Sequence, residues 1–131
     1  MLFRSYDKKT KKYKEFQAIS QRIRRKYGIQ KMSEELPVEL RLFDIIYFEG
    51  KSLTNNDFLS RRKLLKSIIR EKEWKIALAK QIITNEPTEA ESFFAEALKE
   101  GQEGLMVKGL DKKYKPGSRI GYGVKIGRAH V

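Results

Sequence analysis

Two lysines and one aspartate carry the clearest chemical signals in this sequence. Lys108 and Lys125 each follow a short apolar run in the basic C-terminal part of the chain. Such lysines can hold a phosphate group as point charges, although the same placement suits a lysine at an ordinary surface. Asp44 lies inside the apolar run Leu42–Phe48, where an unpaired carboxylate is costly to bury. We therefore expect either a central strand whose acid is held by backbone donors or a lysine, or a strand that lines a pocket.

The composition excludes several other kinds of site. The 131 residues contain no Cys and a single His, His130. Disulfides, thiolate metal sites and a Ser/His/acid triad therefore cannot form within this sequence, and no glycine-rich phosphate-loop motif occurs. The lack of Cys suits an intracellular protein, and we expect a cytoplasmic one. No apolar run approaches the roughly 18 residues of a membrane span, so no membrane partner is expected.

The positive charge is concentrated at both ends of the chain. The formal net charge is +12. Residues 1–31 hold 11 Lys/Arg against two acids, a net of +9, and residues 108–131 hold seven against one, a net of +6. The middle holds 11 basic and 14 acidic residues, a net of −3. The ends favour a polyanionic partner such as nucleic acid or nucleotide phosphate, whereas the middle suits a solvated surface rich in Lys and Glu.

Strand-like and helix-like segments are interleaved along the chain. This order is consistent with an α+β or α/β domain, and we expect a single α+β domain with helices packed on a mixed or antiparallel sheet. The run 38–50 alternates apolar and charged residues and then becomes apolar on both faces, which predicts one strand. The other expected elements are a hairpin over 4–14, helices over 15–27, roughly 56–71 and from Thr88, and strands over 74–84 (with helix as the competing prediction), 104–108 and roughly 120–126.

Two of the predicted helices have recognisable ends. Asn55, Asn56 or Asp57 can cap the helix over 56–71. Thr88 and Glu91 have the spacing of a capping box, and Gly101 suits the left-handed residue at a helix C-terminus. On the first of these helices we expect four basic residues to face solvent: Arg61, Arg62, Lys63 and Lys66.

Three segments together resemble the nucleotide-binding domain of ATP-dependent DNA ligases, most closely the archaeal type. They are Leu42–Gly50, Glu103–Lys108, and Tyr114–Arg119 continuing to Gly123–Ile126. Their order and spacing fit, with about 60 residues between the first two and 17 between Lys108 and Lys125. The resemblance covers roughly residues 5–126. It implies part of the nucleotidyltransferase fold of DNA ligases and mRNA capping enzymes, which is similar to ATP-grasp.

The resemblance implies roles for four residues. Phe43 would stack on one face of adenine, and Met106 would pack on the other. Glu103 would lie near the ribose and phosphates and help to hold Mg²⁺, while Lys125 would contact the α-phosphate of ATP. Asp44 would act as a structural partner, and the resemblance gives Lys108 no definite role.

The sequence also departs from the family pattern. The family begins its reaction with a lysine in a K-x-D-G motif, and no such motif occurs here; Lys26-Tyr27-Gly28 lacks the Asp. A second lysine expected two residues after Lys125 is replaced by Gly127. Residues 1–4 and 128–131 do not resemble the family. We therefore assign no catalytic residue and expect the C-terminal part of a truncated adenylation domain.

Three functions follow as expectations. The first is a fragment of a ligase that seals nicks in double-stranded DNA through enzyme–AMP and DNA–adenylate intermediates, with ATP and Mg²⁺, and that is inactive alone. The second is a basic module that binds nucleotide or nucleic acid through Phe43 and the charged ends. The third is a structural fragment that forms homo-oligomers through exposed sheet edges.

Overall fold

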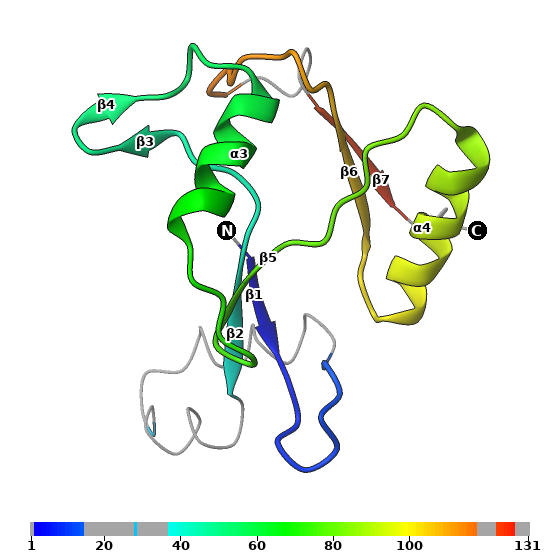
Figure 1. The fold of residues 1–131 in the computed structure, drawn as a ribbon. Coiled ribbons are helices and arrows are strands. Elements are labelled where there is room, and N and C mark those ends of the chain that lie inside the picture. Colours follow the sequence, from blue (N-terminus) through cyan, green and yellow to red (C-terminus); the bar gives the residue numbers. More distant parts are fainter. Residues whose placement is uncertain (1, 15–27, 29–36, 118–122, 128–131) are drawn as a thin grey trace. The chain divides into compact units, whose positions relative to one another are not determined.

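The chain folds into two compact units in a computed structural model that describes residues 2–14, 28, 37–117 and 123–127 (Figure 1). The first unit comprises Met1–Leu42 and Arg70–Gln102, and the second comprises Phe43–Ile69 and Glu103–Val131. The described elements confirm the predicted α+β class, but their strands form three small sheets rather than the single mixed or antiparallel sheet that is expected from the sequence. The helix predicted over 15–27 lies outside the described residues.

The first unit contains a three-stranded mixed sheet with the order β1-β2-β5 (Figure 1). β1 (Leu2–Ser5) pairs antiparallel with β2 (Val38–Leu42), and β2 pairs parallel with β5 (Ile76–Leu78). The basic hairpin predicted over 4–14 is confirmed, because Tyr6 and Tyr13 form an antiparallel bridge. This hairpin therefore extends from the end of β1.

Two strand predictions need correction. The strand expected over 38–50 ends at Leu42, and Phe43–Ile46 is coil before the short strand β3 (Tyr47–Phe48). The strand expected over 74–84 is reduced to Ile76–Leu78. Its start is displaced by a tight turn in which the Ile76 N–H donates to the Lys72 carbonyl and Trp74 has a positive φ of 61°. Apolar composition indicated β structure in both places but did not locate these breaks.

The first unit also contains α4 (Pro87–Lys99), which begins differently from the prediction. Thr88 lies inside the helix rather than at its cap, and the N-cap residue Glu86 makes no side-chain capping bond. Thr84 accepts a hydrogen bond from the Glu86 N–H and donates to Glu89, so it fixes the entry to the helix from outside. Pro87 at the first helical position accounts for the shift, because its fixed φ suits that position. Gly101 has a φ of 82°, which confirms the predicted C-terminal glycine.

The described residues of the second unit form two hairpins and one helix. β3 pairs antiparallel with β4 (Lys51–Ser52) across Glu49-Gly50, and both turn residues have positive φ. β6 (Gly104–Lys108) pairs antiparallel with β7 (Gly123–Gly127), which confirms two predicted strands as far as they are described. α3 (Phe58–Ile68) confirms the helix predicted over 56–71.

Asp57 caps α3, and this interaction should make the stability of the folded chain depend measurably on pH. The Asp57 carboxylate accepts from the Ser60 N–H at 2.7 Å, and hydrogen bonds from Ser60 lower the pKa of Asp57 below its usual value of 3.8. A lowered pKa means that the cap stabilises the folded state above pH 3.8 and that this contribution disappears as the pH falls through the folded pKa. Asp57→Ala should therefore lower the melting temperature at pH 7, with little difference from the parent in strong acid. Asp111→Ala, at another exposed turn, is the control, and an equal loss of stability in both variants would contradict the capping role.

The described part of the chain has a small apolar core and several buried charges. The buried apolar residues of this part include Tyr6, Phe58 and Leu65. Glu39, Arg61 and Arg62 are buried as well. Among the described residues, no helix is both long and apolar enough to cross a membrane.

Candidate nucleotide-binding site

The second unit is organised around a buried ion pair between Asp44 and Arg61. The Arg61 Nε and Nη2 atoms donate to Asp44 Oδ1 and Oδ2 at 2.9 and 3.0 Å, a bidentate arrangement. The Arg61 side chain is 0% exposed and that of Asp44 is 8% exposed. The Ile45 N–H also donates to Asp44 at 2.8 Å. This geometry shows how an acid is accommodated next to an apolar run.

Helix α3 holds the coil Phe43–Ile46 from one side. Arg62 donates to the Phe43 carbonyl at 3.1 Å, and Arg61 donates to the Asn56 carbonyl at 2.7 Å. The prediction that Arg61 and Arg62 face solvent is therefore wrong, whereas Lys63 and Lys66 are exposed as expected. The signal that could have placed the arginines is helical spacing. The buried residues of α3 follow the i, i+3, i+4, i+7 pattern of one face: Phe58, Arg61, Arg62 and Leu65.

Lys108 joins strand β6 to this cluster. Its Nζ lies 5.0 Å from the centre of the Phe43 ring and 4.8 Å from that of Phe58, within the range of a cation–π contact. It also lies 3.9 Å from Asp44 Oδ2, so the two partners expected as alternatives for this acid, a backbone donor and a lysine, are both present in addition to Arg61. Burial lowers the pKa of Lys108, and the opposing attraction of Asp44 does not compensate for it. Lys108 is thus a partly desolvated cation beside an aromatic face.

The β6–β7 ribbon places Met106 and both lysines on one face. Met106 is opposite Lys125, and Lys108 is opposite Gly123. Residues directly opposite in an antiparallel pair share a face, and residues two apart in one strand do so as well. Since the Lys108 ammonium reaches the Phe43 ring, the structure brings three of the predicted residues to one side of the second unit: Phe43, Met106 and Lys125.

Glu103 lies at the start of the same ribbon, where its carboxylate is 3.3 Å from Lys125 Nζ. The two side chains are 65% and 63% exposed, so water screens their attraction and the pair is easily opened. The described residues contain no group of three or more His, Cys, Asp or Glu that could hold a metal alone. Mg²⁺ usually binds through one or two carboxylates together with phosphates and water, and an exposed Glu103 fits that chemistry.

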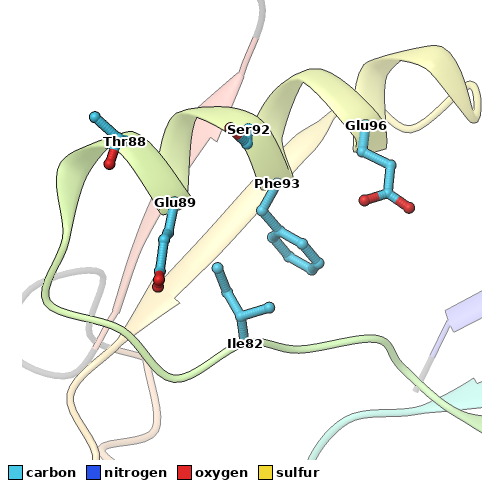
Figure 2. A pocket seen from close by; sticks show the side chains of 6 residues that line it. All are labelled: Ile82, Thr88, Glu89, Ser92, Phe93 and Glu96. Carbon is cyan, nitrogen blue, oxygen red and sulfur yellow. The ribbon is translucent and has the colours of Figure 1, made fainter.

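A hollow elsewhere in the chain has the wrong chemistry for a nucleotide. It lies against α4 in the first unit and has a volume of about 400 Å³. Figure 2 shows Glu89 and Phe93 of the helix pointing toward Ile82. Its charged lining residues, Glu89 and Glu96, are acidic and would repel a phosphate. The surface around Phe43 and the β6–β7 ribbon therefore remains the better candidate.

The sequence identifies the class of protein to which this site belongs. Residues 2–126 match the model of the family described as "ATP dependent DNA ligase domain". This match spans nearly the whole chain, and the chain therefore belongs to the ATP-dependent DNA ligase domain family. The resemblance carried by the three segments is confirmed.

Individual relatives are DNA ligases. The chain is 50% identical over 121 residues to a DNA ligase of Nanoarchaeum equitans, covering 92% of this chain and 21% of that protein. It is 47% identical over 110 residues to a DNA ligase of Methanopyrus kandleri, covering 84% and 20%. A probable DNA ligase of Dictyoglomus thermophilum is 40% identical over 126 residues, covering 96% and 21%. The chain thus spans about a fifth of the length of these curated relatives.

Proposed function

We propose that this chain is the part of an adenylation domain that holds the adenine nucleotide in an ATP-dependent DNA ligase. The observation that carries the proposal is the gathering of Phe43, Met106, Lys108 and Lys125 on one side of the second unit, in a chain of the ligase family. We place it in the nucleotidyltransferase fold of ligases and capping enzymes, which is similar to ATP-grasp, as one partial domain.

Two apolar side chains in this unit offer surfaces for a flat base. Phe43 is 38% exposed, and Met106 is 57% exposed. An aromatic ring stacks on a purine, and a polarisable thioether fills the space on the other face. Burying both surfaces against adenine removes them from water, which favours binding. Phe43 and Met106 are therefore proposed as the base-binding residues.

Charged groups on the same ribbon suit the phosphates. Lys125 is exposed and paired weakly with Glu103, so a phosphate can replace this carboxylate at little cost. Glu103 would then be available to hold Mg²⁺ together with phosphate oxygens. Lys125 would stabilise the negative charge that develops at the α-phosphate. In the whole ligase this site would serve nick sealing in double-stranded DNA through enzyme–AMP and DNA–adenylate intermediates.

This proposal predicts nucleotide binding without covalent transfer of AMP. The 131 residues contain no K-x-D-G segment to supply the nucleophile, so we assign no catalytic residue within them. Incubation with α-labelled ATP and Mg²⁺ should give label that equilibrium dialysis detects and that denaturation releases completely. Label that survives denaturation would contradict the lack of a nucleophile. Failure to retain any ATP at millimolar concentration would contradict the nucleotide site.

A further inference from the structure

A loop rich in lysine belongs to the first unit, whereas the proposed nucleotide site belongs to the second. This lysine loop comprises residues 7–12, with four lysines and one acid, Asp7. Its four lysines are all exposed: Lys8, Lys9, Lys11 and Lys12. None of them forms an ion pair with a residue that the structure describes.

The backbone of the lysine loop is closed by its own hydrogen bonds. The Asp7 N–H donates to the Lys12 carbonyl, and the Lys11 N–H donates to the Asp7 carbonyl, both at 2.9 Å. The Asp7 carboxylate accepts from the N–H groups of Lys9 and Thr10 at 2.7 and 3.1 Å. The only acid of the loop is therefore used to order its backbone rather than to form an ion pair with a lysine side chain.

Tyr13 anchors one end of the loop in the sheet. Its hydroxyl donates to Glu39 at 2.9 Å and accepts from Arg41 at 2.6 Å, and both of these residues belong to β2. The Arg4 guanidinium lies 3.7 Å from the centre of the Tyr13 ring. Three separate contacts thus fix this side chain.

Tyr6 and Trp74 anchor the other end. The ring centres of Tyr6 and Trp74 are 4.9 Å apart, and those of Tyr13 and Trp74 are 5.3 Å apart. The Tyr6 N–H also donates to the Pro37 carbonyl at 3.1 Å. Both ends of the loop are therefore held by several contacts. Its four exposed lysines are carried on a defined backbone.

The charge of the lysine loop differs from that of an ordinary solvated surface. Such surfaces, including those of thermophiles, combine Lys with Glu in ion pairs. In the same unit Lys80 follows this rule, since it pairs with Glu96 and Glu100. The lysine loop instead concentrates like charges, whose repulsion is relieved when a polyanion binds.

We propose that the lysine loop is a contact surface for the phosphate backbone of duplex DNA. Lysine side chains neutralise phosphates without reading sequence, and an ordered loop gives up less conformational entropy on binding than a flexible tail. The choice of DNA among polyanions rests on the proposed function. The order and the charge of the loop are observed independently of that function. The contact would position DNA on the first unit independently of the nucleotide bound by the second.

The salt dependence of DNA binding tests this proposal. A short nicked duplex carrying a fluorophore is titrated with the full chain at several salt concentrations, and log K is plotted against log[salt]. The variant Lys8→Gln/Lys9→Gln/Lys11→Gln/Lys12→Gln should reduce the steepness of this plot by roughly 2 to 4, because each phosphate contact contributes about 0.9. Replacing the same four lysines by Arg keeps the charge and should preserve the slope.

A matched control removes four exposed lysines elsewhere: Lys51, Lys63, Lys66 and Lys99. This Lys→Gln control has the same net charge as the loop variant but should change the slope by less than about 1. An equal change in both variants, or no change in the loop variant, would overturn the proposal. ATP binding is measured on the same samples to separate the two proposals. If no ATP binds, the nucleotide site is refuted, but the comparison of salt slopes still tests the DNA contact.

Discussion

Asp44→Asn should lower the free energy of unfolding by about 3–5 kcal/mol, the cost of removing one partner of a buried ion pair. The neutral amide has a single oxygen acceptor, so the buried Arg61 guanidinium keeps only one of its two hydrogen bonds to this side chain. The substitution also removes the carboxylate that faces the partly desolvated Lys108 ammonium. Arg61 lies on α3 and Lys108 on β6, so returning either cation to water requires moving one of these elements. The free-energy cost of the unpaired charge is therefore not easily reduced by local rearrangement.

Urea denaturation of the variant and the parent measures this effect, with Asp111→Asn as an exposed acid-to-amide control. The double variant Asp44→Asn/Arg61→Met should be less destabilised than the sum of its single variants, because the second change removes the charge that the first leaves unpaired. A loss of stability for Asp44→Asn within about 0.5 kcal/mol of the Asp111→Asn value, a typical surface effect, would contradict this structural role.

The buried cluster shows what the sequence could and could not predict. The cost of an unpaired charge correctly indicated that Asp44 is held by backbone donors or a lysine, and both kinds of partner are present, but it did not indicate Arg61. The burial of Arg61 and Arg62 is not predicted, because charged residues on a helix are expected to face solvent on the basis of their type. The positions of Arg61 and Arg62, three and four residues after Phe58, place them on the apolar face. The prediction relied on residue type, whereas the helical spacing correctly indicates which residues are buried.

The end of the strand predicted over 38–50 is wrong for a related reason. Period-two alternation correctly predicted β2, and the apolar residues that follow it indicated continued β structure. Leu42 nevertheless ends the strand, since hydrogen bonds from Arg61 and Arg62 hold the next two residues in coil. These hydrogen bonds come from a helix 17 to 19 residues later in the chain, and local patterning does not contain them. The site residues, in contrast, came from ordered motifs, and their roles remain predictions.

Phe43→Ala should weaken binding of ATP by roughly 5- to 150-fold, because stacking of a base on an aromatic side chain contributes about 1–3 kcal/mol. Phe43 is suited to this role by its surroundings rather than by exposure alone. Its carbonyl is held by Arg62, and its ring lies 5.0 Å from Lys108 Nζ. A ring whose backbone is already fixed loses little further freedom when a base stacks on it.

Tyr47→Ala is the matched control, since Tyr47 is an aromatic residue of the same unit that is 64% exposed on β3. Calorimetric titration with ATP should give nearly equal affinities for this variant and the parent. Phe43→Leu separates stacking from simple apolar burial, because leucine keeps apolar surface but has no π face. Equal weakening by Phe43→Ala and Tyr47→Ala would indicate a general loss of structure. Full affinity in Phe43→Ala would place the adenine elsewhere on the chain.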